Sequence, residues 1–363
     1  MAGKSAAHGL ALKDAEMMKL IQQFVSPIGE ELWRNVEMEQ VPFVATVAPV
    51  VVPNVSMPVV GGAISTRELS GLYLQELLSA GANVIGGSAD LGGSTSVKVA
   101  AARVIGADDF SGNYINYGVR EHAMGAIMNG LALSGLRAFG STFLVFSDYM
   151  RPSMRVAALS GLPVVYVLTH DSIAVGEDGP THQPVEQLPS LRMMPNLNVF
   201  RPCNAAEVVY AWRRALREEH KPTAIVLSRQ KFVQVPTPLG AEISRGAYII
   251  RPSESGRVRV TLLATGSEVP LAVRVAERLG RDVQVVSVPS VADFRAQNME
   301  YKSRMLSGFV VAIEAAASAP WFEFADAVVG IDKFGASGPG DEIYSMAGFN
   351  VDAIVRDIKN QLK

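Results

Sequence analysis

The sequence predicts an α/β protein with two tandem three-layer domains, mainly parallel sheets and an extended N-terminal arm. Apolar strand-like segments alternate with amphipathic helical segments over most of the 363 residues. This alternation stops at a loop near residues 231–245, which contains Pro and Gly, and then restarts. Strands that alternate with helices form parallel sheets covered on both faces. We therefore expect an arm or linker at residues 1–61, a first domain at 62–235 and a second at 236–363.

The N-terminal arm differs in composition from the rest of the chain. Residues 13–24 have the apolar spacing of a short amphipathic helix. Residues 41–58 are rich in Val and Pro, which favours extended, non-helical chain.

The first domain should begin with a helix at Ser65-Thr66-Arg67-Glu68, which fits a capping box. Gly81 is expected to end this helix. Four apolar residues are expected on its buried face: Leu69, Leu72, Tyr73 and Leu77.

The remaining elements follow from hydrophobic periodicity. First-domain strands are expected at residues 83–86, 138–142, 163–169 and 224–228, with helices at 121–134, 150–159 and 205–219. Second-domain strands are expected at residues 260–264, 282–288, 309–313 and 327–330, with a helix at 269–279. A last amphipathic helix carries Val351, Ile354, Val355, Ile358 and Leu362.

Composition narrows the class of protein. Hydrophobic content of 48% with 19% charged residues is typical of a soluble globular enzyme. A net charge of -2 gives no electrostatic reason to expect nucleic acid or an anionic membrane as a partner. The single cysteine, Cys203, excludes an internal disulfide framework and suits a reducing compartment. With no basic-then-apolar segment at the start of the sequence, we expect a cytoplasmic protein.

One acid and a nearby aromatic loop are the strongest functional signal. Glu121 opens a helix rich in small residues, and residues 140–146 read Gly-Ser-Thr-Phe-Leu-Val-Phe. An acid is common in a helix first turn, and the spacing of Phe143, Phe146 and Tyr149 also occurs on ordinary helical core faces. However, Phe143 should end a strand, at the sheet edge where α/β proteins bind ligands. We interpret the set as a pocket for a flat polar ring.

Several segments resemble transketolase motifs and occur in the family's order: 87–91, 116–124, 169–172, 176–184, 227–230 and 264–269. The resemblance implies thiamine diphosphate as the cofactor. Glu121 would hydrogen-bond its aminopyrimidine ring, Phe143 and Phe146 would hold that ring, and Tyr149 would contribute more weakly. Asp90 would lie near the cofactor.

The resemblance also implies roles for loop residues. Asp178 would bind the substrate hydroxyl next to the carbonyl, and His182 would assist proton transfer and hydroxyl binding. His170 would contact a sugar phosphate. His8 would touch the diphosphate and the substrate. A histidine in a surface loop is more commonly just solvated, but here two of five histidines belong to one loop.

Arg67, Ser94 and Arg229 match the family's phosphate-binding positions. Arginine binds phosphate oxygens in a bidentate manner, although an arginine at such places is commonly a surface ion-pair partner. Ser94 lacks the proline often found before it in the family. The turn at residues 264–268 precedes a helix and contains no nucleotide-binding fingerprint, so we assign it a structural role.

The metal turn that the cofactor needs, Gly-Asp-Gly followed by an asparagine, is missing from the sequence, and residues 338–342 lack the spacing. We therefore expect the C-terminal half of a split transketolase, with no metal ligands of its own. A separate diphosphate-binding subunit would hold Mg²⁺ or Ca²⁺, and the two chains would form a heterotetramer. The enzyme would move a two-carbon ketol unit from a ketose phosphate to an aldose phosphate. The isolated chain should be inactive.

Three alternatives remain. The first is a deoxyxylulose phosphate synthase-like subunit, although the sequences of residues 117–121 and 178–182 match transketolase motifs better. The chain could be a two-oxoacid dehydrogenase β-like subunit, which shares the domain plan but has no use for a loop of two histidines and an aspartate. It could also be a non-catalytic scaffolding subunit, which needs no polar site.

Overall fold

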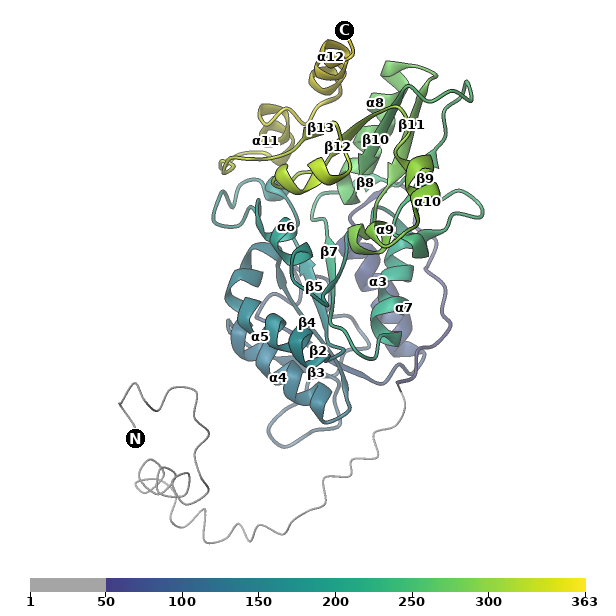
Figure 1. Cartoon of the computed structure of the whole chain (residues 1–363). Coiled ribbons are helices and arrows are strands. Elements are labelled where there is room, and N and C mark those ends of the chain that lie inside the picture. Colours follow the sequence, from purple (N-terminus) through teal and green to yellow (C-terminus); the bar gives the residue numbers. More distant parts are fainter. Residues whose placement is uncertain (1–49) are drawn as a thin grey trace, which may run out of the picture. The chain divides into compact units, whose positions relative to one another are not determined.

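The computed structural model describes residues 50–363 and confirms an α/β fold with two tandem domains (Figure 1). The sheet of the first domain has six parallel strands in the order β3-β2-β4-β5-β7-β6. These strands are β2 (Val84–Ser88), β3 (Tyr114–Asn116), β4 (Arg137–Phe143), β5 (Val165–Thr169), β6 (Asn198–Phe200) and β7 (Thr223–Leu227). The two three-residue strands, β3 and β6, were not expected from the sequence.

Helices cover both faces of this sheet. Helices α3 (Thr66–Ser79) and α7 (Ala205–Arg217) pack on one face, and α4 (Glu121–Leu133), α5 (Ser147–Ser160) and α6 (Gln187–Arg192) pack on the other. Successive side chains of a strand point to opposite faces. In β5, Val165 and Val167 accordingly join the α3/α7 core, while Tyr166 and Leu168 join the α4/α5 core. A continuously apolar strand therefore serves two cores.

The start of α3 has the expected capping box. Ser65 Oγ accepts a hydrogen bond from the Glu68 amide (3.3 Å), and the Glu68 carboxylate accepts one from the Ser65 amide (3.1 Å). The expected buried face was wrong in one position, because Leu72 is 37% exposed. Leu74 is fully buried instead, since it lies beside Leu77 on the inner face of the helix.

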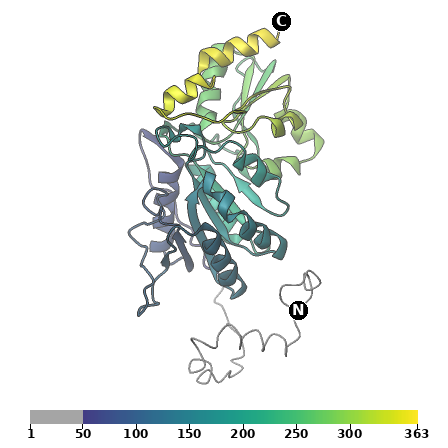
Figure 2. The same ribbon diagram turned by 90° about the vertical axis from the view of Figure 1, so that its left-hand side faces the viewer.

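The second domain has a five-stranded sheet in the order β13-β12-β10-β11-β9, in which only β9 is antiparallel to its neighbour. Its strands are β9 (Tyr248–Arg251), β10 (Val260–Ala264), β11 (Val283–Ser287), β12 (Phe309–Ile313) and β13 (Ala327–Val329). Helices α8 (Val269–Leu279) and α12 (Val351–Gln361) pack on one face, and α9 (Val291–Arg295) and α10 (Met299–Met305) on the other. Helix α12, yellow in Figures 1 and 2, ends before Leu362, which lies just beyond it.

Shorter elements connect these layers. They are α11 (Gly340–Met346) and the 3₁₀ helices η2 (Leu144–Phe146), η3 (Ile173–Val175), η4 (Ile243–Arg245), η5 (Gly266–Glu268) and η6 (Ala319–Glu323). The two-residue strands β1 (Ala63–Ile64) and β8 (Phe232–Val233) form an antiparallel pair.

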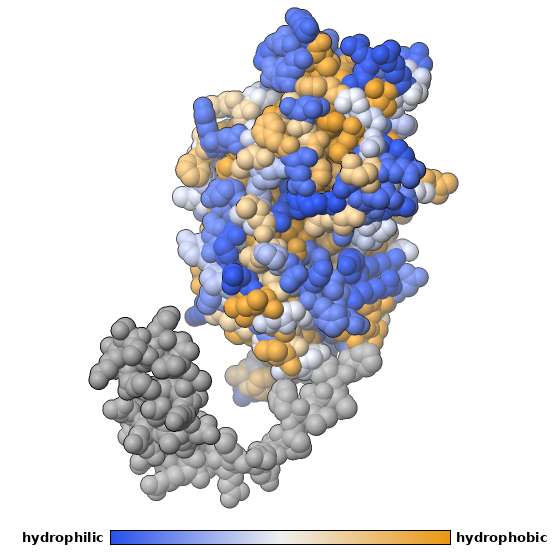
Figure 3. Space-filling model, in the orientation of Figure 1, coloured by the Kyte–Doolittle hydropathy of each residue, from blue (hydrophilic) through white to orange (hydrophobic). Residues whose placement is uncertain are grey.

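Residues 50–60 form neither helix nor strand, as expected for this Val- and Pro-rich stretch. They lie against the chain's own first domain, where Arg213 of α7 donates to the Val55 carbonyl (2.8 Å). The expected helix at residues 13–24 lies outside the described residues. No helix of the described part is long and apolar enough to cross a membrane. On the face drawn in Figure 3, hydrophobic residues lie in small groups among hydrophilic ones.

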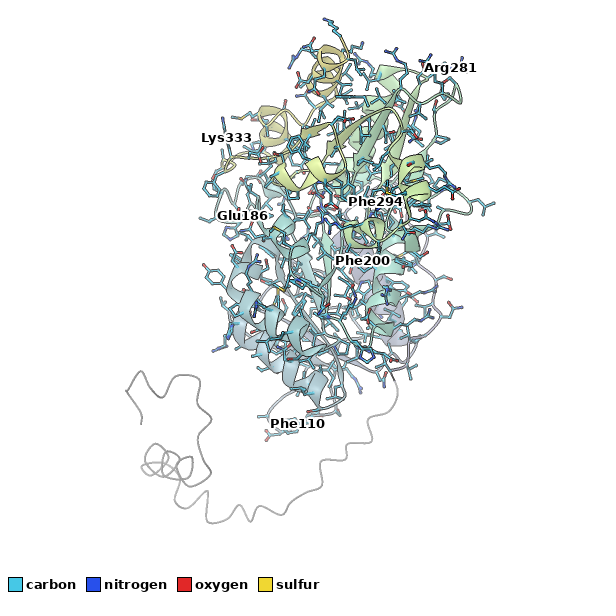
Figure 4. The ribbon with its side chains drawn as sticks, viewed as in Figure 1. Phe110, Glu186, Phe200, Arg281, Phe294 and Lys333 are labelled. Carbon is cyan, nitrogen blue, oxygen red and sulfur yellow. The ribbon has the colours of Figure 1, made fainter. Side chains whose placement is uncertain are left out.

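The two domains touch along one edge of the first sheet, the upper edge in Figure 1. Helix α9 contacts β6, and Figure 4 shows Phe294 and Phe200 from these elements close to the boundary. The Arg201 amide donates to the Pro289 carbonyl (2.9 Å), and the Ala317 amide donates to the Val185 carbonyl (3.0 Å). The edge where the first-domain strands end is therefore next to the second domain.

Candidate active site

The predicted site residues come mostly from segments that directly follow parallel strands. Phe143 ends β4, His170 follows β5, Arg229 lies two residues beyond β7, and Asp90 lies two residues beyond β2. Parallel strands bring all these ends to one edge of the sheet, where ligands of α/β proteins bind. The topology thus explains why residues distant in sequence converge.

Glu121 is the first residue of α4 and is 7% exposed. One of its carboxylate oxygens accepts a hydrogen bond from Thr142 Oγ1 at 3.2 Å. Within residues 50–363, the second oxygen has no hydrogen-bond partner and no cation pairs with the group. This second oxygen is not among the buried unpartnered atoms of the described residues, and Glu121 lines an open pocket, so the oxygen is accessible from outside the chain. The arrangement therefore leaves Glu121 able to bind a hydrogen-bond donor from outside the chain.

An open pocket of about 670 Å³ lies beside this carboxylate. Its lining includes Phe146 and Tyr149 together with residues at the start of α4: Val119, Arg120, Glu121, His122 and Ala123. The rings of Phe146 and Tyr149 have their centroids 6.2 Å apart. Val119 and Tyr149 are 76% and 68% exposed, which is unusual for apolar and aromatic side chains beside a buried acid. The pocket has aromatic walls, one acid and an open side.

Phe143 is buried more deeply than Phe146. It is 6% exposed, and its ring stacks on Phe146 (5.8 Å, 11°) and on His170 (3.6 Å, 24°). His182 approaches the edge of the same stack, 5.3 Å from the Phe146 ring centroid. The structure thus brings both histidines of the loop to the two phenylalanines, although 12 positions separate the histidines in sequence.

Arg67 and Arg229 come together because the start of α3 is joined to the end of β7. Thr66 Oγ1 accepts a hydrogen bond from the Ser228 amide (2.8 Å), and the Ser228 hydroxyl accepts one from the Thr66 amide (3.0 Å). The Arg67 guanidinium donates to the Ser94 carbonyl, while its buried Nε has no partner. Burial and the nearby charge of Arg229 lower the pKa of Arg67.

His170 borders this positive region. Burial, followed by the charges of Arg67, Arg229 and His182, lowers its pKa to about 3, so the ring is neutral near pH 7. Thr169 Oγ1 lies 2.8 Å from Nδ1, the ring nitrogen nearest the backbone. Two guanidinium groups beside a neutral imidazole supply positive charge that suits a phosphate.

Other predicted residues are more loosely placed. The side chains of Asp178, Asp90 and Ser94 are exposed, and Asp178 lies in the loop between Gly176 and His182. Asp90 has a left-handed backbone (φ 63°). His8 lies outside the described residues. Among residues 50–363, no cluster of three His, Cys, Asp or Glu side chains is arranged to hold a metal.

Two features escaped the sequence reasoning. The first is Thr142, which lies in the segment 140–146 and donates a hydrogen bond to Glu121. Its position at a strand end, directly before Phe143, could have indicated this role. The second is a buried ionic network between the domains, centred on Arg201. Arg201 Nε donates to Asp171 (2.9 Å), and Nη1 contacts Glu268. Its partners lie 30 and 67 positions away, so no local pattern indicates it.

The sequence matches the transketolase pyrimidine-binding domain over residues 62–234 and a transketolase-like C-terminal domain over residues 246–350. It is 48% identical over 322 residues to the transketolase of Geobacillus stearothermophilus, covering 84% of this chain and 48% of that protein. The chain thus spans about half the length of the curated relatives that it matches.

Solved structures agree with this assignment. A transketolase from Leishmania mexicana superposes with a TM-score of 0.79 at 41% identity, covering 83% of this chain and 46% of that chain. A structure titled as a split gene transketolase, inactive beta4 tetramer, has a TM-score of 0.66 at 24% identity. It covers 82% of this chain and 98% of that chain, and at this identity it supports the fold alone. The chain belongs to the transketolase family, of which it carries the pyrimidine-binding and C-terminal domains.

Proposed function

We propose that this chain supplies the pyrimidine-facing half of a transketolase active site. Transketolase chemistry requires thiamine diphosphate, which, when bound, supplies the nucleophilic carbon that accepts a two-carbon ketol unit. The observation that carries the proposal is the partly unsatisfied carboxylate of Glu121 beside an aromatic pocket. Its free oxygen fits a ring N–H donor. Phe146 and Tyr149 line the pocket and fit the flat faces of an aminopyrimidine, and Phe143 supports Phe146 from behind by stacking on it.

Different residues of this chain would bind the cofactor ring and the substrate. Glu121 would hold a proton shared with the ring, in a site where burial strengthens the hydrogen bond. The Thr142 hydroxyl would keep that carboxylate oriented. The loop that carries Asp178 and His182 would bind substrate hydroxyls. The rings of Phe143 and Phe146, which lie beside His182, would exclude water.

The positive region beside His170 supports phosphorylated sugars as substrates. Arg67, with an unpartnered Nε, and the exposed Arg229 supply fixed positive charge. His170 would donate a hydrogen bond from a neutral ring, because its lowered pKa prevents it from adding a further cation. The proposed reaction is transfer of a two-carbon ketol unit from a ketose phosphate to an aldose phosphate.

A separate chain is proposed to bind the diphosphate end of the cofactor with Mg²⁺ or Ca²⁺. The open side of the Glu121 pocket and the exposed Val119 and Tyr149 support this, since a second protein surface would cover them. We propose a heterotetramer with two sites at subunit boundaries. The complex would work in the cytoplasm, where the buried thiol of Cys203 needs no disulfide partner.

The test is Glu121→Gln, which keeps the shape of the side chain and removes its charge. The variant is co-expressed with the diphosphate-binding chain and assayed with thiamine diphosphate and Mg²⁺. Ketol transfer should fall by about 10² to 10⁴-fold, the usual contribution of a positioned acid or base, while the two chains still co-purify. The exposed Glu219→Gln is the matched control and should retain activity. Unchanged transfer in Glu121→Gln would refute the role of this acid, and transfer by the isolated chain would refute the half-site.

A further inference from the structure

The two residues that follow His170 are both bound by residues at the boundary with the C-terminal domain. Asp171 pairs with Arg201 (2.9 Å), and Arg201 in turn contacts Glu268 of η5. Ser172 Oγ lies 2.8 Å from the hydroxyl of Tyr344 in α11, and that hydroxyl also lies 3.0 Å from Glu268. One C-terminal carboxylate therefore anchors two successive positions of the first domain.

His170 needs such support because its backbone is left-handed, with φ of 59°. For a residue with a Cβ this conformation is unfavourable and persists only where the surroundings impose it. The hydrogen bonds of Thr169, Asp171 and Ser172 surround the strained position on both sides. Since the strain coincides with a residue of the proposed phosphate site, the contacts that impose it are relevant to function.

The anchoring network is fully enclosed. The side chains of Arg201, Asp171 and Glu268 are 0–1% exposed. Glu268 also accepts a hydrogen bond from the Ala315 amide (3.1 Å), which ties it to the segment just after β12. Charge pairs in a water-free site hold their geometry tightly because separating them is costly. The network is therefore a rigid connection between the two domains.

The far end of the same loop is also supported by the C-terminal domain. Gln183 donates to the Gly176 carbonyl (3.0 Å) and to the Ala336 carbonyl (2.9 Å), so one side chain joins the loop to the segment before α11. Gly340 packs so closely that a Cβ there would lie 2.7 Å from the Ala174 carbonyl oxygen. Contacts from one C-terminal segment thus span residues 172–183.

We propose that the C-terminal domain acts as a platform that holds the loop from His170 to Gln183 in its binding geometry. Tyr344 and Glu268 are positioning residues, which act through Ser172 and through the Arg201–Asp171 pair. This gives the turn at residues 264–268, assigned above to structure alone, a part in substrate binding. The inference rests on the proposed function for the role of His170 as a phosphate contact.

The test compares Tyr344→Phe with Tyr301→Phe. Each variant removes one hydrogen-bonded hydroxyl from the C-terminal domain, but the Tyr301 hydroxyl donates to the Ala247 carbonyl (2.6 Å), within the C-terminal domain itself. In the full chain, amide hydrogen exchange at residues 170–176 should accelerate in Tyr344→Phe and stay unchanged in Tyr301→Phe. Unchanged exchange in Tyr344→Phe would overturn the proposal whether or not the protein is a transketolase.

The functional arm uses the assembled complex with thiamine diphosphate and Mg²⁺. In Tyr344→Phe, the KM for xylulose 5-phosphate should rise about fivefold to tenfold, the range for losing one buried hydrogen bond. The KM for unphosphorylated xylulose and both kcat values should change less than about twofold. Tyr344 supports the His170 end of the loop through Ser172, whereas Gln183 still holds the end that carries His182. Equal changes with both donors, or equal changes in Tyr301→Phe, would contradict positioning of the phosphate site. Absence of transfer in the wild-type complex would refute the proposed function, and the exchange experiment would still decide whether the platform exists.

Discussion

Replacing Arg201 by leucine should destabilise the chain severely. Its guanidinium is 0% exposed and contacts carboxylates that are 0–1% exposed in both domains. Glu314, 3.6 Å away, retains Arg192 at 2.7 Å, so Asp171 and Glu268 lose the most. Removing one partner of a buried ion pair costs about 3–5 kcal/mol, because the remaining charge is buried without compensation. We expect a loss of this size in the free energy of unfolding.

The control is Arg295→Leu, which removes a bidentate pair with Glu323 on the surface. Those side chains are 47% and 42% exposed, so its loss should cost at most about 1 kcal/mol. Urea unfolding of the full chain can be followed by the fluorescence of Trp212 in the first domain and Trp321 in the second, both of which are buried. If Arg201→Leu and Arg295→Leu differ by less than about 1 kcal/mol, the network does not connect the domains as described.

Two further predictions concern the loop from His170 to Gln183 and its contact with the C-terminal domain. Gly340→Ala should cost about 1–3 kcal/mol of unfolding free energy because its Cβ would meet the Ala174 carbonyl, whereas Gly130→Ala, with no atom within 4 Å, should be neutral or stabilising in urea unfolding. In the folded chain the pKa of His170 is lowered to about 3, whereas in the unfolded chain it is about 6.5. Below pH 6.5 the unfolded chain therefore binds a proton that the folded chain does not bind. The free energy of unfolding of the wild type should fall as the pH drops from about 6.5 towards 3, by up to about 1.4 kcal/mol per pH unit. His170→Asn should lack this component of the pH dependence, and identical profiles for the two proteins would contradict a buried neutral imidazole.

The sequence predicted those parts of the fold whose signals are local. Ser65 and Glu68 are three residues apart, and their capping box forms as expected. Long apolar strands such as β5 and β10 were identified because each is buried on both faces. The short β3 and β6 were missed because each contains Asn, which is depleted in strands, whereas the equally short β13 (Ala-Val-Val) was expected at residues 327–330.

The candidate site was predictable to the extent that strand ends determine it. Phe143 ends a parallel strand and His170 and Arg229 follow parallel strands, and the topology gathers them at one edge. The network around Arg201 could not be predicted, because it depends on how the two domains pack. Leu72 was placed wrongly for a related reason, since helical spacing gives the period of the buried face and packing decides its centre.

We propose above that Glu121 binds the aminopyrimidine ring of a cofactor whose diphosphate is held by another chain. The most direct measurement is a crystal structure of the assembled complex with thiamine diphosphate and Mg²⁺. We expect a Glu121 carboxylate oxygen within about 2.6–3.2 Å of a ring nitrogen, with Phe146 and Tyr149 beside the ring. A cofactor ring bound elsewhere, or a Glu121 side chain turned away from it, would show that Glu121 does not have this role.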